Sequence, residues 1–408
     1  MKTDRQHLVV LGAGYTGLLC AIRLARRTRR LGARITLVNP SARFTERLRM
    51  HQVAAGQELA AHPIAALLEG TGVTFLQGRA TAIDPAARSV TVARTDGAGT
   101  GTGGSDADGT EELRYDELVY ALGSVADTSA VPGADTHAWT LDDPRTAHRF
   151  SVLLPELAAA GGTVTVCGGG LTGVETAAEL AESHPGLHVT LISRETPGAL
   201  MGNGARRYLL RALDRLGVTL RTGSAVTKVL PDAVELGGNE LVPSGLCLWT
   251  AGVRVSPLAA DAGIATDERG LIVVDAALRS VSHPDVHAVG DAAAVRQAWG
   301  QIHGTCQSGM PIAAHTADTI ARELRGKEPR PFRFGYVHQP VALGRRDAVI
   351  QFTRANDTPR RAYLTGRAAA FYKESVSGSP VPVYRLSRRV SVPVTLSKGG
   401  RANHRLAL

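Results

Sequence analysis

The sequence lacks long hydrophobic runs. None of its apolar stretches approaches the roughly 18 residues that a membrane-spanning helix needs. The N-terminal residues, MKTDRQHLVVLGAG, enter a strand-like run almost at once, which leaves no room for a signal peptide. We therefore expect a cytoplasmic protein without an integral membrane segment.

Cysteine is scarce, with only four residues in 408. Cys20, Cys167, Cys247 and Cys306 lie far apart in sequence and form no CxxC or CxxxxC pair. This spacing argues against a disulfide framework, a metal site and a redox-active dithiol, and it fits a reducing cytoplasm.

Acidic residues are in the minority, and the net charge of +9 allows an anionic lipid surface or an acidic protein as partner. The plainer interpretation is that arginine serves as the default surface residue. RLARRTRR, residues 23–30, then reads as the solvated face of a helix. We expect no nucleic-acid partner, while peripheral contact with a membrane stays open.

Two segments repeat one strand–glycine turn–helix–strand pattern. In the first, strand 7–11 precedes GAGYTG, a helix with apolar residues at helical spacing, and strand 34–38. In the second, strand 163–166 precedes GGGLTG, a helix and strand 188–192. Each is a βαβ unit with GxGxxG at its first turn, as dinucleotide binding requires.

The glycines have separate roles in such a turn. The first permits the tight turn, the second lets the backbone approach a pyrophosphate, and the third lets helix and strand pack closely. The helix N-terminus then adds N–H donors and partial positive charge. The residues in these roles are Gly12, Gly14 and Gly17 in the first unit and Gly168, Gly170 and Gly173 in the second.

Neither second strand ends in the acidic residue that normally binds an adenosine ribose. Asn39 ends the first unit and can hydrogen-bond a hydroxyl without charge. Ser193 and Arg194 end the second, where they could bind a 2′-phosphate that a carboxylate would repel. This favours NADPH over NADH, although Arg194 could instead be a surface arginine that stacks on adenine.

The remaining segments complete an α/β protein of two or three domains. We expect strands near 73–76, 89–92, 246–250 and 271–274, a mobile Gly/Thr/Asp-rich loop over 94–112, and a helix over 311–324. The part from about residue 331 reads as strand-rich, and its tail alternates like a strand around Pro382 and Pro393. The order predicts one domain over 1–130 and 265–328, a second inserted over 131–264, and a C-terminal α+β domain over 329–408.

Taken together, these motifs resemble the flavoprotein oxidoreductases with two dinucleotide folds, and within them the type II NADH dehydrogenase-like branch. The likeness covers most of the chain. Besides GAGYTG it rests on five segments: YDELVYALGS (115–124), VHAVGD (286–291), LWTAGVRVSP (248–257), FTERLRMHQVAAG (44–56) and the C-terminal PFRFGYVHQPVALGRRDAV (331–349).

The resemblance implies two cofactors, FAD and NAD(P)H, bound by the two Rossmann-like domains. It assigns FAD to the first glycine turn and Asn39, with Arg49, Ala80, Gly123, Asp291, Pro311 and Ile312. It assigns NAD(P)H to the second glycine turn with Glu175, Ser193, Arg194 and Gly252. The helix that carries Ile312 is expected to point its first N–H groups at the flavin. No metal is implied.

The departures from the family pattern concern the electron acceptor. Disulfide reductases of this fold carry CxxxxC where this chain has residues 47–52, RLRMHQ. The AQxxxQ signature of membrane-bound type II dehydrogenases reads TCQSGMP here, so Gln307 matches the first glutamine and Pro311 replaces the second. The paired cysteines of sulfide:quinone reductases are also missing, and Cys306 reads as a small buried filler.

Four residues are candidates for catalysis. Glu175, at the ligand end of the second helix, matches a glutamate that the family places near the nicotinamide and flavin. It could instead only complement the helix dipole. His51 could protonate an acceptor, Arg49 could stabilise a reduced flavin or an oxyanion, and Gln307 would line the acceptor face. Packing or surface roles stay open for His51 and Arg49.

The predicted function is that of a soluble FAD-dependent NAD(P)H oxidoreductase that reduces a quinone or a quinone-like aromatic small molecule. One alternative is a reductase of an acidic electron-transfer protein such as a ferredoxin, steered by the positive charge. Another is a flavin-based redox sensor. A homodimer is compatible with each of them.

Overall fold

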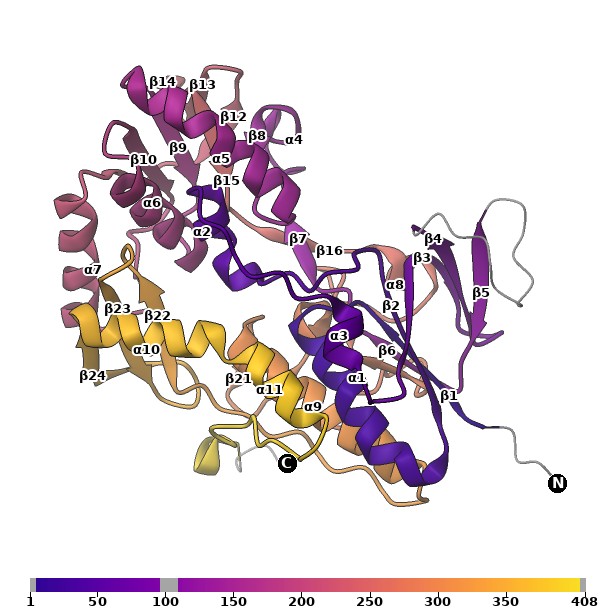
Figure 1. The fold of residues 1–408 in the computed structure, drawn as a ribbon. Helices are drawn as coiled ribbons and strands as arrows, with labels where there is room; N and C mark the ends of the chain where they lie inside the picture. Colours follow the sequence, from indigo (N-terminus) through magenta and orange to yellow (C-terminus); the bar gives the residue numbers. More distant parts are fainter. Residues whose placement is uncertain (1–4, 96–108, 404–408) are drawn as a thin grey trace.

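The computed structural model describes residues 5–95 and 109–403. It is a mixed α/β molecule in which two larger sheets and one small C-terminal sheet each carry helices, as expected from the sequence (Figure 1). Most of the predicted loop over 94–112 lies outside the described residues. The strands on either side of it, β4 (Ser89–Arg94) and β5 (Thr110–Arg114), pair antiparallel.

The larger sheet has seven strands in the order β18-β6-β1-β2-β3-β4-β5. Five of them run parallel: β1 (His7–Leu11), β2 (Arg34–Asn39), the first part of β3 (Thr74–Asp84), β6 (Glu117–Tyr120) and β18 (Val286–Ala288). Every residue of β1 is buried, which is typical of a parallel strand covered on both faces. Helices α1 (Tyr15–Thr28) and α9 (Cys306–Glu323) pack against each other beside this sheet (Figure 1).

The second sheet is parallel throughout, in the order β11-β10-β9-β15-β8. Its strands are β8 (Ala138–Trp139), β9 (Thr163–Cys167), β10 (His188–Ser193), β11 (Thr219–Thr222) and β15 (Leu246–Trp249). Its helices are α5 (Pro144–Ala159), α6 (Leu171–Ser183) and α7 (Asn203–Arg215). Both βαβ units that the sequence predicted are therefore present in the structure.

Shorter elements connect these layers. The strands are β7 (Ser124–Ala126) with β16 (Val253–Val255), and the antiparallel set β12 (Val226–Val229), β13 (Ala233–Leu236) and β14 (Glu240–Pro243). The two-residue strands are β17 (Ile272–Val273), β19 (Ala293–Ala294), β20 (Arg296–Gln297) and β21 (Gly300–Gln301). The helices include α2 (Met50–Ala54), α3 (Ile64–Leu68), α4 (Ala134–His137) and α8 (Leu258–Asp261).

The C-terminal part differs from the sequence prediction. Antiparallel strands β22 (His338–Ala342), β23 (Ala348–Thr353) and β24 (Pro359–Thr365) form as expected, but two helices follow, α10 (Gly366–Gly378) and α11 (Pro380–Ser387). The prediction of a strand-like tail was wrong over these residues, because Pro380 is the first residue of α11, where its missing N–H costs nothing. Among the described residues, no helix has the length and apolar character needed to cross a bilayer.

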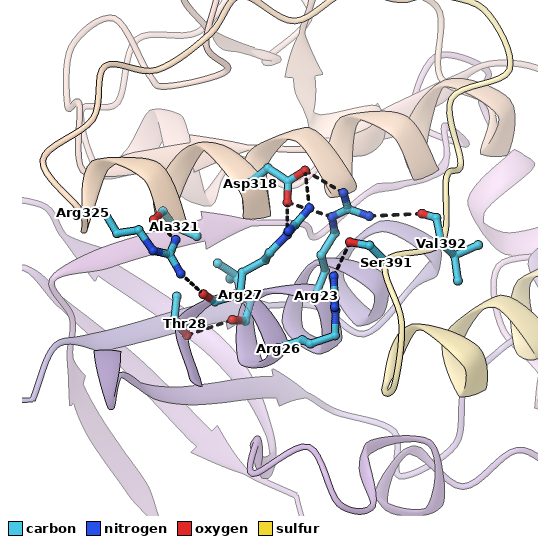
Figure 2. A network of polar contacts seen from close by, with 10 residues as sticks. Arg23, Arg26, Arg27, Thr28, Asp318, Ala321, Arg325, Ser391 and Val392 are labelled. Atoms are coloured by element: carbon cyan, nitrogen blue, oxygen red, sulfur yellow. Dashed lines mark hydrogen bonds and ion pairs between the residues drawn. The ribbon is translucent and has the colours of Figure 1, made fainter. Parts of the chain in front are cut away.

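Helix α11 lies against α1, and a polar network joins the same region to the chain that follows α11 (Figures 1 and 2). Asp318 of α9 accepts hydrogen bonds from Arg23 and Arg27 of α1, and Arg26 contacts Ser391. The Arg23 side chain is only 13% exposed. The interpretation of residues 23–30 as a solvated face was therefore wrong for these arginines, whose guanidinium groups join three segments of the chain.

Candidate functional site

The first glycine turn leaves one open position. Gly12 has φ +95°, and a Cβ there would lie 2.4 Å from the Ala121 carbonyl oxygen. A Cβ on Gly17 would lie 1.8 Å from the carbonyl oxygen of Gly12. A Cβ on Gly14, directly before α1, would meet nothing within 4 Å. The first and third glycines thus serve packing, and the second faces space that a pyrophosphate can approach.

The second glycine turn has the same arrangement. Gly168 has φ +123° and lies against Thr250, and a Cβ on Gly173 would lie 1.8 Å from the Gly168 carbonyl oxygen. Gly170, directly before α6, again faces open space. Two turns with the same open middle position match the predicted pair of dinucleotide sites.

The ends of the neighbouring strands contact these turns differently. The side-chain oxygen of Asn39 accepts a hydrogen bond of 2.9 Å from the Ala13 N–H, so Asn39 braces the first turn. Ser193 lies so close to the second turn that a Cβ on Gly169 would be 2.1 Å from its hydroxyl oxygen. Arg194 is exposed, and within the described chain it forms no ion pair or hydrogen bond.

Segments far apart in sequence meet at the first turn. The Asp291 carboxylate accepts a hydrogen bond of 2.8 Å from the Ser124 hydroxyl, next to Gly123. Thr16, inside the glycine motif, lies against both Gly290 and Gly309. GAGYTG, the end of YDELVYALGS, VHAVGD and the start of α9 therefore surround one place, which fits the FAD site that the resemblance implies.

Helix α9 begins earlier than the sequence predicted. Thr305 caps it by accepting from the Ser308 N–H, and Ser308 returns a bond to the Thr305 N–H. The free N–H groups therefore belong to the residues after Thr305, and Pro311 and Ile312 lie buried in the second turn. The predicted start at residue 311 was wrong, since Pro311 lies inside the helix. The assignment of Pro311 and Ile312 to FAD stays a prediction.

The assignments of Ala80 and Gly252 also stay predictions. Ala80 is a half-buried residue of β3 beside an irregularity in its pairing with β4. Gly252 follows β15 with φ +77° and lies near Asp127. The surroundings of Ala80 and of Gly252 do not test whether either residue binds a cofactor.

Glu175 is buried on α6 and held by three groups. Its carboxylate pairs with Lys373 of α10 at 2.8 Å, accepts from the Ala342 N–H at 3.0 Å, and lies 4.0 Å from the His51 ring. Burial by itself would raise the pKa of Glu175, but Lys373, His51 and the Ala342 N–H together lower it below its usual value. Glu175 is therefore a charged carboxylate at neutral pH.

His51 is buried beside it on α2. Burial lowers the pKa of His51 to about 4, although the Glu175 carboxylate acts in the opposite direction. The imidazole is therefore neutral at physiological pH, with Nδ1 toward Glu175. Its Nε2 is buried and lacks a hydrogen-bond partner within the described residues.

Arg49 and Gln307 are both held in place. Arg49 pairs with Glu374 of α10 and lies 3.7 Å from Glu46. Gln307 donates to the His338 carbonyl at 2.9 Å and accepts from the Val337 N–H at 2.7 Å. The Gln307 amide therefore pairs with backbone groups at the start of β22, where another strand would otherwise supply the hydrogen-bond partners. The alignment of Gln307 with a family glutamine did not indicate this structural role.

The neighbouring Cys306 is a partly exposed free thiol, not the buried one expected from the sequence. Burial, and next the charge of Asp291, raise the pKa of the Cys306 thiol to about 12. The thiol stays protonated at neutral pH. Elsewhere, Cys167 and Cys247 lie on adjacent strands with sulfurs 3.7 Å apart, a proximity that their 80-residue separation concealed. Both are free thiols.

Three consecutive residues of α10 connect the predicted catalytic residues. Tyr372 bonds the His338 ring at 2.7 Å, and the His338 carbonyl accepts from Gln307. Lys373 pairs with Glu175, and Glu374 pairs with Arg49. Sequence reasoning missed this segment because it read the tail as strand-like. The helical spacing of small and apolar residues in GRAAAFYKES was the signal that could have revealed it.

No group of three or more potential metal ligands occurs among the residues that the structure describes.

Comparison with known proteins identifies related chains over almost the whole length. Residues 6–317 match the family model described as pyridine nucleotide-disulphide oxidoreductase. An NADH dehydrogenase-like protein of Mycobacterium tuberculosis is 30% identical over 394 residues, which cover 91% of this chain and 92% of that protein. A type II NADH:quinone oxidoreductase of Staphylococcus epidermidis is 26% identical over 409 residues, covering 92% and 95% respectively.

Among solved structures, the sulfide:quinone oxidoreductase of Aquifex aeolicus superposes with a TM-score of 0.78. The superposition covers 94% of this chain and 92% of the other at 20% sequence identity. At that identity the likeness supports the fold, and the electron donor and acceptor have to be argued from this chain's own residues.

Proposed function

Because the chain belongs to the pyridine nucleotide-disulphide oxidoreductase family, we propose that it is an FAD-dependent NAD(P)H:quinone oxidoreductase of the type II NADH dehydrogenase-like branch. The observation that carries the proposal is the pair of glycine turns with the same open middle residue, Gly14 in one and Gly170 in the other. Two dinucleotides bound in one chain are what a flavin-dependent oxidoreductase needs.

The first turn, with Asp291 and the start of α9, is the proposed FAD site. The N–H groups at the α9 N-terminus would face negative charge on the flavin favourably. The second turn, with Ser193 and Arg194, is the proposed NAD(P)H site. We propose the corresponding domain bounds as 1–130 with 265–328 for FAD, 131–264 for NAD(P)H and 329–408 for the C-terminal domain.

A bound flavin supplies the hydride chemistry, and the protein supplies position and proton control. We propose that Glu175, fixed by Lys373 and the Ala342 N–H, orients the reacting groups at the meeting point of α6, β22 and α10. Arg49 is held by Glu374, the residue that follows Lys373 on α10. The burial of Glu175 and His51 keeps bulk water away from this cluster.

The proposed acceptor is a quinone or a quinone-like aromatic small molecule. Residues 47–52 contain no cysteine, so the chain lacks the dithiol that disulfide reductases use at this place. Cys306 is a protonated thiol without a second cysteine beside it in the described chain. The Staphylococcus epidermidis relative, whose name states a quinone acceptor, supports the same class.

We also propose a preference for NADPH. The second βαβ unit ends in Ser193 and the exposed Arg194, which can bind a 2′-phosphate. An acidic residue at this position would favour NADH instead.

The test is anaerobic stopped-flow spectroscopy of the purified yellow protein. NADPH should bleach the flavin absorbance, and a soluble naphthoquinone such as menadione should restore it within the catalytic turnover time. A colourless protein that cannot be reconstituted with FAD would overturn the proposal. Rapid reoxidation by ferredoxin alone, with rates that fall steeply as salt rises, would favour the electron-transfer protein as acceptor.

A further inference from the structure

A cavity of about 70 Å³ lies between α2, α6, the β22–β23 turn and α10. Its wall includes buried residues, among them His51 and Glu179, and exposed residues, Arg345 and Glu374. The lining therefore runs from the protein interior to the surface. A water molecule needs only about 10–15 Å³ of such volume and two or more polar partners, so the cavity can hold several waters.

Two buried polar atoms in this wall have no protein partner in the described chain. They are Oε2 of Glu179 and Nε2 of His51. A buried carboxylate oxygen and a buried imidazole nitrogen without hydrogen bonds are costly, and water in the cavity is the available partner for both. Glu179 and His51 thus both line the cavity, and each carries one polar atom without a protein partner in the described chain.

Glu179 lies one helical turn after Glu175 on α6, on the same face. Its other carboxylate oxygen, Oε1, accepts from the Gln57 amide and lies 4.0 Å from the Arg345 guanidinium. Burial raises the pKa of Glu179 to about 7, against the lowering effects of Arg345 and Gln57. Glu179 is therefore a carboxyl that gains and loses a proton near neutral pH, unlike Glu175, whose pKa is lowered below its usual value.

Reduction of a quinone consumes one proton from solvent. The balanced reaction is NAD(P)H + H⁺ + quinone → NAD(P)⁺ + quinol, in which one hydrogen comes from NAD(P)H as hydride and the other is a proton. This requirement rests on the proposed function. In this cluster Glu175 and His51 are buried and the Lys373 side chain is only 12% exposed, so that proton needs a route.

We propose that the cavity is this route and that Glu179 relays the proton from solvent at Arg345 to the pair His51 and Glu175. In each turnover the Glu179 carboxyl passes its proton inward through cavity water to the imidazole Nε2, and a proton from solvent replaces it. The imidazole gives its Nδ1 proton to Glu175, and Glu175 gives that proton to the reduced acceptor. The imidazole then returns to the tautomer with a proton on Nδ1 before the next turnover. Glu179 acts through His51 and Glu175, so it is a positioning residue for the proton and does not contact the acceptor.

The charged and titratable groups that face Glu179 define the expected pH dependence. They are His51 of α2, Glu175 and Glu182 of α6, Arg345 and Asp347 of the β22–β23 turn, and Lys373 and Glu374 of α10. The neutral amide of Gln57 also donates a hydrogen bond to Glu179. Since a relay needs a protonated carboxyl, quinone reduction should slow as pH rises through about 7.

The direct test is Glu179→Gln, compared with Glu58→Gln as a control that removes an exposed carboxylate next to Gln57. The pre-reduced enzyme is mixed with menadione across the neutral pH range. We expect Glu179→Gln to slow reoxidation by roughly tenfold or more and to lose the decline near pH 7. Reduction by NAD(P)H should stay unchanged in both variants, because that half-reaction needs no proton from solvent.

A second variant keeps the test decisive if Glu179→Gln folds poorly. Arg345 is exposed at the cavity rim and lowers the pKa of Glu179. Arg345→Ala should therefore move the decline in reoxidation rate to higher pH while the fold persists. A profile that does not move would overturn the relay.

Infrared difference spectroscopy tests the inference without turnover. A protonated carboxyl band should titrate near pH 7 in the wild type and in Glu58→Gln and be missing in Glu179→Gln. If the wild type lacks this band, or if Glu179→Gln reoxidises with the wild-type rate and pH profile, the relay is overturned. If the wild type is never reoxidised by menadione, the proposed function itself fails, which is a different result.

Discussion

Lys373 of α10 and Glu175 of α6 form an ion pair of 2.8 Å between side chains that are only 12% and 8% exposed. The pair joins the proposed NAD(P)H-binding helix to a helix about 200 residues later in the chain. Because both charges are largely removed from water, each depends on the other for compensation.

The first prediction concerns the loss of this compensation. Lys373→Met should leave the Glu175 carboxylate buried without its cation and destabilise the protein by about 3–5 kcal/mol at neutral pH. Urea unfolding followed by circular dichroism measures the change. The pKa of Glu175 should rise in the variant, so the loss should be smaller at acidic pH.

The control is the double variant Lys373→Met with Glu175→Gln, which removes both charges. If the pair interacts as the structure shows, the double variant should be more stable than the sum of the single changes predicts, by at least about 1 kcal/mol. Strictly additive effects would contradict the coupling.

The glycine turns allow a sharper test, because the three glycines of one motif differ in the space around them. Gly170→Ala should fold normally, since Gly170 has an extended backbone and its Cβ meets nothing within 4 Å. It should nevertheless weaken NAD(P)H binding by tenfold or more, about 1.4 kcal/mol, by occupying the approach to the pyrophosphate. Titration with NAD(P)H, followed by protein fluorescence, measures this loss.

The matched variant is Gly173→Ala, whose Cβ would lie 1.8 Å from the Gly168 carbonyl oxygen. We expect it to lower the melting temperature or prevent soluble expression, because helix and turn must move apart. Equal thermal stability of the two alanine variants would contradict the assignment of packing to one glycine and binding to the other.

The strands, the glycine turns and their helices could be predicted because their signals are local. The five buried residues of β1, the GxGxxG spacing and the apolar period of α6 each appear within about fifteen residues of sequence. The pairing of β18 with β6 is different in kind. It joins segments 168 residues apart, and the sequence analysis did not predict it, because the resemblance of VHAVGD to a family motif indicated a role in FAD binding and no strand partner.

The proposed catalytic cluster was predicted only in part for the same reason. Glu175 and His51 were named from their positions in motifs, but Lys373 and Glu179 complete their surroundings through tertiary contacts. Lys373 lies in the C-terminal region, which the sequence analysis predicted as strand-like and which contains two helices. Glu179 looked like one more polar residue on an amphipathic helix, and only the cavity beside it distinguishes it.

Coenzyme preference gives the third prediction. Arg194→Ala should weaken NADPH binding by tenfold or more, because it removes a charge-assisted contact with the 2′-phosphate worth about 1.5–3 kcal/mol. NADH binding should change by less than about threefold. Arg211→Ala, an exposed arginine further along α7, serves as the control. Equal losses for both coenzymes in Arg194→Ala would favour stacking on adenine instead.

The last prediction concerns acid stability and His51. In the folded protein the pKa of His51 is lowered to about 4, whereas in the unfolded chain it returns to its ordinary value near 6.5. Between these values the unfolded state binds a proton that the folded state does not. Stability from this residue is therefore fully present above pH 6.5 and is lost as pH falls toward 4, by a total on the order of 3 kcal/mol.

His51→Gln should remove this dependence, so its unfolding free energy should fall less steeply between pH 6.5 and 4 than that of the wild type. His148→Gln changes an exposed histidine on α5 and should keep the wild-type slope. Some slope should remain in every variant, because burial also lowers the pKa of His7, His315 and His338. Urea unfolding at several pH values measures the slopes. Identical slopes for wild type and His51→Gln would mean that the imidazole is hydrated or protonated in the folded protein, which would also remove His51 as the neutral acceptor of protons from the cavity.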